Sequence, residues 1–143
     1  MNEEIQKQLY QLELYNQQVN KLQEELEKIE LMRLEVLKSI ESMDELKNSK
    51  ELLVPLGGGA FVKAEVVDCE KIIVGAGADV FVEKSTSEVV QDFKKYAEEL
   101  NNAEVMLKEQ ISKTISVIKK LQNDLESKAQ MMEQQPSQGN LTN

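Results

Sequence analysis

Residues 51–84 read ELLVPLGGGAFVKAEVVDCEKIIVGAGADVFVEK, and this stretch decides the fold. Apolar residues alternate with other residues on both sides of Gly57-Gly58-Gly59, and again on both sides of Gly75-Ala76-Gly77. Alternation around a short glycine loop is typical of a β-hairpin, because successive side chains of a strand point to opposite faces. The stretch therefore predicts two β-hairpins in tandem.

The even-numbered apolar residues of the first hairpin share one face if Leu56 opposes Ala60 across the turn. The opposite face is also apolar, since it carries Leu53, Phe61, Val67, Ile73 and Phe81. Short strands with two apolar faces and open edges are marginal alone, so we expect other subunits to complete the sheet. The candidate oligomerisation residues are Leu53, Phe61, Val67, Ile73, Val80, Phe81 and Val82.

Residues 1–47 lack Gly and Pro and are rich in Glu, Gln, Leu and Lys, which predicts one long helix. Alternating steps of four and three residues from Met1 meet apolar or aromatic side chains at nearly every position. These steps land on Ile5, Gln8, Leu12, Tyr15, Val19, Leu22, Leu26, Ile29, Arg33, Val36, Ile40 and Met43. An apolar seam with an average spacing of about 3.5 residues is typical of a coiled coil. The polar seam residues Gln8 and Arg33 are interpreted as register-setting positions.

Ser85-Thr86-Ser87-Glu88 has the spacing of a capping box, which predicts the start of a second helix. Its expected seam is Val89, Phe93, Tyr96, Leu100, Ala103, Leu107, Ile111, Thr114, Ile118, Leu121, Leu125 and Met132. Two successive steps of four, from Ala103 through Leu107 to Ile111, predict a stutter in the coiled coil. The polar segment after Met132 contains Pro and Gly and predicts a disordered tail.

The expected fold class is α+β: a long antiparallel two-helix coiled coil flanks two tandem β-hairpins that join an oligomeric β-barrel. The expected bounds are 1–47 for the first helix, 51–84 for the hairpins, 85–132 for the second helix and 133–143 for the tail. Two antiparallel helices would bring both chain ends to one tip. Near that tip the chain has more apolar side chains than one seam buries: Met1, Ile5, Leu9, Tyr10, Leu12, Leu14, Leu121, Leu125, Met131 and Met132. These are candidate contacts for other proteins, with extra packing between the helices as the alternative.

Composition argues against several other classes of function. The net charge of −9 and the lack of a basic stripe argue against nucleic-acid binding. The chain has no His and a single cysteine, Cys69, which argues against metal and acid–base sites and fits a reducing cytosol. Cys69 itself is interpreted as strand packing. The glycine runs do not match a phosphate loop and no apolar stretch is long enough for a membrane span, so we expect a cytoplasmic protein that is neither an enzyme nor a cofactor binder.

The order helix, two glycine-turn hairpins, helix resembles the α subunit of the prefoldin family, of the archaeal type. The resemblance covers residues 1–132, and its most specific parts are Val54 to Phe61 and Val74 to Lys84. It implies a hexamer of two α and four β subunits in which residues 51–84 assemble a β-barrel platform. It also implies an ATP-independent holdase that binds unfolded client proteins at the coiled-coil tips and passes them to a group II chaperonin.

Other interpretations of the sequence remain open. One is a prefoldin-like paralogue that assembles into filaments through the same β segment. Another is a structural coiled-coil spacer, which predicts polar helix ends. An enzyme is the least favoured.

Overall fold

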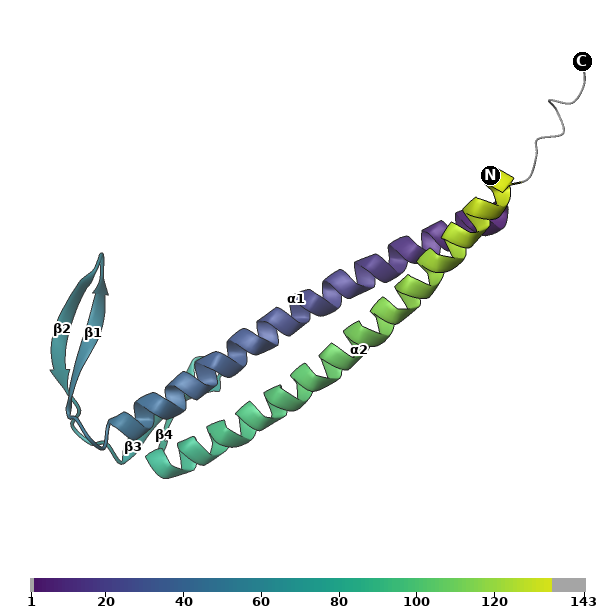
Figure 1. Cartoon of the computed structure of the whole chain (residues 1–143). Coiled ribbons are helices and arrows are strands. Elements are labelled where there is room, and N and C mark those ends of the chain that lie inside the picture. Colours follow the sequence, from purple (N-terminus) through teal and green to yellow (C-terminus); the bar gives the residue numbers. More distant parts are fainter. Residues whose placement is uncertain (1, 135–143) are drawn as a thin grey trace, which may run out of the picture. The chain divides into compact units, whose positions relative to one another are not determined.

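The computed structural model describes residues 2–134, so Met1 and most of the expected tail, residues 135–143, lie outside the described residues. Helix α1, Glu3–Glu45, is followed by strands β1, Glu51–Gly57, and β2, Ala60–Glu65 (Figure 1). Strands β3, Lys71–Gly77, and β4, Val80–Ser85, then lead into helix α2, Thr86–Gln134. The described chain is therefore α+β, with two long helices flanking two hairpins.

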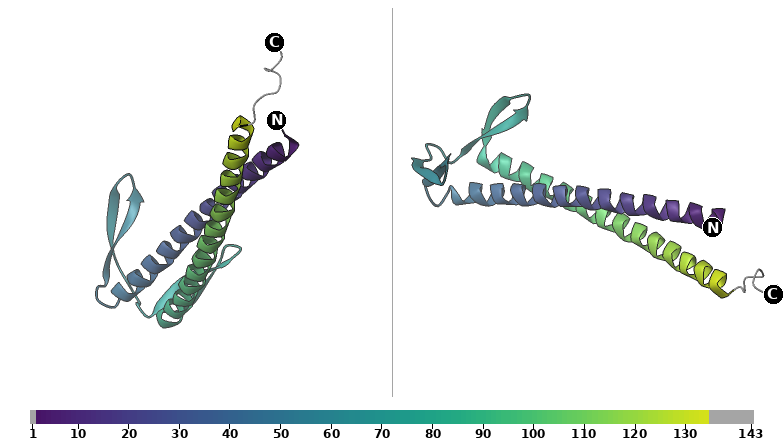
Figure 2. Two further views of the ribbon diagram at one scale, coloured as in Figure 1. Left: turned by 45° about the vertical axis from the view of Figure 1, so that its right-hand side comes forward. Right: turned by 90° about the horizontal axis from the view of Figure 1, so that it is seen from above.

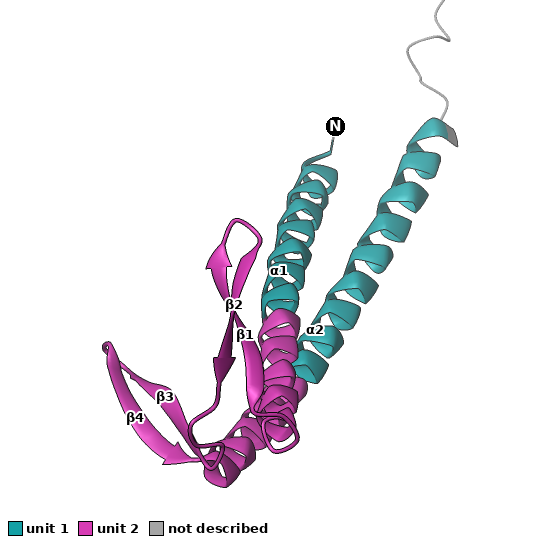
Figure 3. Cartoon of the chain, turned by 90° about the vertical axis from the view of Figure 1, so that its left-hand side faces the viewer, with its two compact units in different colours: residues 1–28, 104–143 teal, residues 29–103 magenta. Residues whose placement is uncertain are grey.

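The chain divides into two compact units (Figure 3). Unit 1 comprises residues 1–28 and 104–143, and within it the first part of α1 lies beside the last part of α2. Unit 2 comprises residues 29–103 and holds all four strands with the adjoining parts of both helices. The expected assembly residues and the expected client residues thus belong to different units.

Helix α1 starts at a capped N-terminus and buries one stripe. The backbone N–H of Glu4 donates to Oδ1 of Asn2 at 3.2 Å, which satisfies one of the free donors of the first turn. Each expected seam position from Ile5 to Met43 is buried or half-buried, and Val19, Ile40 and Met43 are buried most deeply. The predicted seam of the first helix is confirmed.

Helix α2 begins as the capping residues predict, because Oγ of Ser85 accepts from the backbone N–H of Glu88 at 3.2 Å. Its seam differs from the prediction at three positions, of which the last is Met132, which is 52% exposed. Tyr96 is 40% exposed and Ala97 is buried instead, while Glu104, only 3% exposed and engaged in a polar or electrostatic interaction, replaces Ala103 as the most buried position there.

These two replacements move the irregular step along α2. The buried positions around Glu104 keep the regular alternation of four and three, so the predicted stutter after Ala103 is wrong. The successive steps of four run through Val89, Phe93 and Ala97 instead. The physical reason is polarity at the seam: burying Tyr96 would also bury a hydroxyl that needs a hydrogen-bond partner, whereas Ala97 has no polar side-chain atom, and a partnered carboxylate can be buried where a lone one cannot.

Each hairpin is a separate antiparallel sheet of two strands, and both views in Figure 2 show two separate ribbons. In the first, Val54 pairs with Val62 and Leu52 with Ala64, so the predicted even-numbered face is confirmed for these residues. The predicted opposition of Leu56 to Ala60 is wrong, because Ala60 pairs with Gly57 and Leu56 is the extra residue of a β-bulge. Ala76 occupies the same bulge position in the second hairpin.

The two hairpins are a structural repeat with an offset of 20 residues. Val54 pairs with Val62 as Val74 pairs with Val82, and the bulges lie between Pro55 and Gly57 and between Gly75 and Gly77. The repeat extends beyond the strands: the N–H of Val66 donates to the Lys50 carbonyl oxygen, and the N–H of Thr86 donates to that of Glu70, each at 2.8 Å. The same backbone conformation therefore occurs twice with different side chains.

The turns of the two repeats are not equally relaxed. Gly58 and Gly59 have φ of 60° and 82°, which glycine adopts freely, whereas the equivalent Ala78 and Asp79 have φ of 50° and 60°. We expect Ala78→Gly to stabilise the second hairpin by about 0.5–1 kcal/mol, because a Cβ is disfavoured in the left-handed region. Hydrogen exchange of the β3 and β4 amides should slow by about two- to fivefold. Gly58→Ala is the matched control and should speed exchange in the first hairpin; slower exchange there would contradict the turn assignment.

Candidate functional site

The odd-numbered faces of the two hairpins form the first candidate surface. Leu53 and Phe61 on the first hairpin are 61% and 59% exposed, and Ile73 and Phe81 on the second are 72% and 68% exposed. Large apolar side chains at this exposure, together with unpaired strand edges, mark a protein-binding surface. Four of the expected oligomerisation residues thus lie where they can meet another protein.

The other three expected oligomerisation residues lie elsewhere. Val80 and Val82 are exposed, and Val82, paired with Val74, lies on the even-numbered face of β4. Val67 is fully exposed but lies beyond the end of β2, in the connector that leads to β3, so its placement on a strand was wrong. The Val66 N–H donates to the Lys50 carbonyl oxygen, one position beyond the pair of Glu51 and Glu65, and Val67 follows this last bond of the ladder.

The even-numbered face of the second hairpin is turned toward the helices. Ile72 and Val74 are half-buried and line a groove together with Met43 of α1 and with Val89 and Phe93 of α2. Val89 is only 2% exposed, which makes it the most deeply buried large side chain among the described residues. The helix ends therefore form a small core that holds this hairpin and leaves its odd-numbered face outward.

The second candidate surface lies on unit 1, near the chain ends. Of the expected client residues, Leu9, Tyr10, Leu14, Met131 and Met132 are exposed, with Tyr10 at 63% and Met131 at 67%. The seam residues Ile5, Leu12, Leu121 and Leu125 are half-buried between the two helices. Met1 lies outside the described residues. The predicted set thus divides into an exposed group and a group that the helix pair partly covers.

One ion pair joins the two helices of unit 1 near these residues. Nζ of Lys128 lies 3.0 Å from Oε1 of Glu4, and both side chains are partly exposed. The nearby seam residue Gln8 has its side-chain carbonyl oxygen, Oε1, buried without a hydrogen-bond partner. Because an exposed ion pair contributes little and an unsatisfied buried carbonyl is unfavourable, this end of the helix pair is weakly held.

Sequence reasoning missed a group of exposed apolar residues on α1 within unit 2. Leu31, Leu34 and Leu37 recur every three residues and are 60%, 53% and 41% exposed. The signal was available in the sequence, because these leucines flank the seam positions Arg33 and Val36. They were not named as candidates because they lie beside the seam and not on it.

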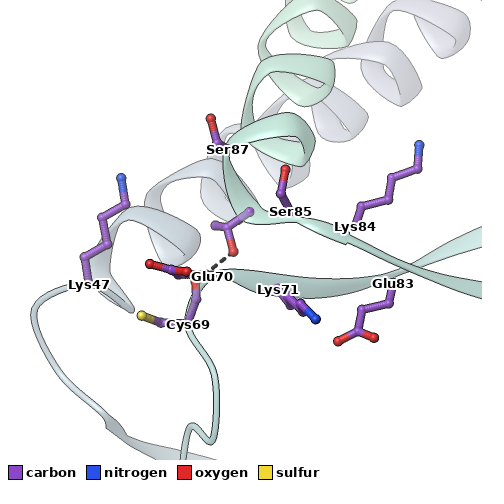
Figure 4. Close-up of a pocket in the computed structure, with 9 residues that line it drawn as sticks. Lys47, Cys69, Glu70, Lys71, Glu83, Lys84, Ser85 and Ser87 are labelled. Atoms are coloured by element: carbon purple, nitrogen blue, oxygen red, sulfur yellow. Dashed lines mark hydrogen bonds between the residues drawn. The ribbon is translucent and has the colours of Figure 1, made fainter.

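A pocket of unit 2 lies beside the connector between the hairpins (Figure 4). It is lined by Lys47, Cys69, Glu70, Lys71, Glu83, Lys84, Ser85, Thr86 and Ser87. The Thr86 hydroxyl, which is buried, donates to the Cys69 carbonyl oxygen at 2.7 Å and ties the connector to the start of α2. Cys69 is half-buried in this connector, so its expected place in a strand was wrong.

The pocket cannot hold a thiol–imidazole pair, since Cys69 is the only thiol in the sequence and the sequence has no histidine. Across residues 2–134, no cluster of three or more His, Cys, Asp or Glu side chains is suited to a metal ion. In the same residues neither helix is long and apolar enough to cross a membrane.

Comparison with known proteins matches this geometry. The family model described as "Prefoldin subunit" matches residues 15–134. The chain is 59% identical over 135 residues to "Prefoldin subunit alpha" of Methanococcus aeolicus, covering 94% of each chain. It is 39% identical over 104 residues to "Prefoldin subunit alpha 1" of Methanocaldococcus jannaschii, covering 73% of this chain and 72% of that one.

Two solved structures share the fold. A filamentous prefoldin from Methanocaldococcus jannaschii, solved by cryo-EM, has a TM-score of 0.66 at 22% identity and covers 78% of this chain and 95% of its own. The prefoldin β subunit of Thermococcus strain KS-1 has a TM-score of 0.62 at 20% identity and covers 87% of this chain and 90% of its own. Because the family model covers residues 15–134 and an archaeal α subunit is 59% identical over 94% of each chain, the chain belongs to the prefoldin family of non-enzymatic chaperone subunits.

Proposed function

We propose that the chain is the α subunit of an ATP-independent holdase in the cytoplasm. Two copies assemble with four prefoldin β subunits through residues 51–84, and the helix ends capture unfolded proteins and pass them to a group II chaperonin. The observation that carries this proposal is the presence of two exposed apolar surfaces on different units, the hairpin faces on unit 2 and the chain-end residues on unit 1.

The hairpin faces support the assembly part of the proposal. Each hairpin has two strands with open edges, and an isolated hairpin with an exposed apolar face is not stable in water. Hairpins from other subunits would pair with these edges and cover Phe61 and Phe81, giving an interface with aromatic residues at its centre. The hairpins are then the part of the chain that other subunits stabilise most.

The exposed chain-end residues support the client part. Burying the apolar surface of Leu, Tyr and Met side chains contributes a free energy of about 25 cal/mol per Å². Methionine also adapts its shape to varied partners. Such contacts are nonspecific, which suits the binding of unfolded chains of any sequence. Several weak sites on one assembly gain affinity by acting together.

The test is to mix the purified chain with a prefoldin β subunit and to measure mass by native mass spectrometry. We expect a complex of two α and four β chains that suppresses aggregation of a chemically unfolded test protein equally well with and without ATP. Neither chain alone should match the mixture at equal total concentration. Failure to form a mixed complex, or suppression that requires ATP, would contradict the proposal.

A second candidate is a subunit of a homomeric filament, which the similarity to the filamentous prefoldin from Methanocaldococcus jannaschii favours. It predicts long polymers of the chain alone and no change on adding the β subunit. A plain coiled-coil spacer is disfavoured, because it predicts polar helix ends and Tyr10 and Met131 are exposed there.

A further inference from the structure

The two hairpins present the same three rows of side chains on their odd-numbered faces, because they are one backbone repeat. From base to turn, the rows of the first hairpin are Glu51 with Glu65, Leu53 with Lys63, and Pro55 with Phe61. The rows of the second hairpin are Lys71 with Ser85, Ile73 with Glu83, and Gly75 with Phe81. Each row combines one residue from each strand, so the faces can be compared row by row.

The charges of equivalent rows are opposite in sign. The base row of the first hairpin carries two carboxylates, Glu51 and Glu65, for a formal charge of −2, whereas the second has Lys71 and the neutral Ser85, for +1. The middle row is also reversed. Lys63 gives it +1 on the first hairpin and Glu83 gives it −1 on the second.

The row nearest the turn is aromatic in both repeats. Phe61 lies opposite Pro55, and Phe81 lies opposite Gly75. A Cβ at position 75 would come within 3.5 Å of the Phe81 ring, so that ring lies across the glycine. Each face is therefore flat and apolar at its turn end and charged at its base.

We propose that the odd-numbered face of the first hairpin packs against the odd-numbered face of the second hairpin of another copy of this chain, with both turns at the same end. The aromatic rows then meet, the base rows meet with −2 against +1, and the middle rows meet with +1 against −1. This inference rests on the proposed function, in which residues 51–84 mediate assembly, and it names which surface binds which.

The same charges oppose the two alternative pairings. Packing the first hairpin on its own copy brings Glu51 and Glu65 against the same pair and Lys63 against itself. Packing the second hairpin on its own copy brings Lys71 against Lys71 and Glu83 against Glu83. Like charges in contact are unfavourable, so only the mixed pairing has opposite charges in both charged rows.

The partner is a second copy, because the charged rows of one face complement those of the other and the two faces do not cover each other within one chain. The hairpins form separate sheets, and the central residues Leu53 and Ile73 remain 61% and 72% exposed. The backbone bonds from Val66 to Lys50 and from Thr86 to Glu70 close the base of each hairpin, which keeps the five-residue connector between them compact. Two copies related by a twofold axis could form this contact twice, which closes the interface.

The test is a charge exchange in the full-length chain that leaves the net charge at −9. One variant carries Lys71→Glu with Glu83→Lys, and a second carries Glu51→Lys with Lys63→Glu. Each should weaken self-association by about tenfold in sedimentation equilibrium, because like charges then meet in the middle row. In the variant that combines all four substitutions, opposite charges meet again in the middle row. Its self-association should recover to within about threefold of that of the original chain.

Circular dichroism should show equal helix content in all four proteins, since the exchanged residues are exposed on the hairpins. The inference would be overturned if the two double variants associated as tightly as the original chain. It would also be overturned if the quadruple variant associated no better than the weaker of the double variants. An original chain that is monomeric at all concentrations would overturn it too. Mixing with the β subunit separates the two ideas: if a mixed complex still forms and suppresses aggregation, the proposed function stands although the pairing rule has failed.

Discussion

Removing residues 1–10 and 124–143 is expected to abolish the suppression of aggregation while the oligomer persists. The deleted segments carry Tyr10, Met131 and Met132, which are exposed, and they belong wholly to unit 1. The hairpins belong to unit 2 and keep every residue of their interface. Complexes of the truncated and full-length chains with the β subunit should have the same subunit count, yet the truncated one should need at least about ten times the concentration to hold an unfolded test protein.

The matched control replaces exposed apolar side chains of the same kind on unit 2. Leu31, Leu34 and Leu37 are also exposed leucines on α1, but they lie in unit 2. Replacing all three by serine should leave the suppression of aggregation near that of the full-length chain. Leu9→Ser alone should also have little effect, because several sites bind the unfolded protein together. Undiminished activity of the truncated chain would place the client site outside the deleted segments, and a loss of activity in the leucine variant would then place it on unit 2.

Replacing both Phe61 and Phe81 by aspartate is expected to give the second large effect, the loss of assembly. Both rings are more than half exposed in the single chain and lie on the odd-numbered faces that other hairpins would cover. Burying an unpaired carboxylate at such a position is strongly unfavourable, so association should weaken by at least about a hundredfold. Sedimentation velocity should show the oligomer replaced by smaller species, with the helices intact by circular dichroism.

Lys50→Asp and Lys84→Asp together are the control for adding charge to the hairpins, since both residues are polar already and neither belongs to the three rows of the odd-numbered faces. This pair should weaken assembly far less than the aromatic pair does. If the oligomer stays intact in the variant with both phenylalanines replaced, the odd-numbered faces are not buried on assembly. The proposed packing of the first hairpin on the second would then be wrong as well.

The sequence predicted the order of elements because the relevant signals are local. Glycine runs flanked by alternating residues are read within about ten positions, and the seam of α1 follows from spacing alone. The Ser85 cap was likewise found from its own four residues. These features depend on the backbone conformation of neighbouring residues, which a single sequence contains.

The features that sequence reasoning missed depend on residues far apart or on small backbone irregularities. The bulges at Leu56 and Ala76 leave the alternation of side chains nearly intact, so no pattern reveals them. The burial of Ala97 in place of Tyr96 depends on which side of α2 faces its neighbours, and two adjacent apolar residues do not show this in the sequence. Val67 looks like a strand residue by composition, but it lies just beyond the last backbone bond of the hairpin, which runs from the Val66 N–H to the Lys50 carbonyl oxygen.

The ion pair between Glu4 and Lys128 spans 124 positions of the chain and so bears on the order of folding. Each hairpin closes a loop of two residues, Gly58-Gly59 or Ala78-Asp79, which takes microseconds. Each doubling of loop length adds only about 0.6 kcal/mol to closure, but contacts distant in sequence must wait until nearer ones have shortened the loop. Helix pairing should therefore nucleate beside the hairpins and propagate toward the chain ends, which close last and open first in the native state. The residues proposed to hold unfolded proteins are thus the last of the described chain to fold.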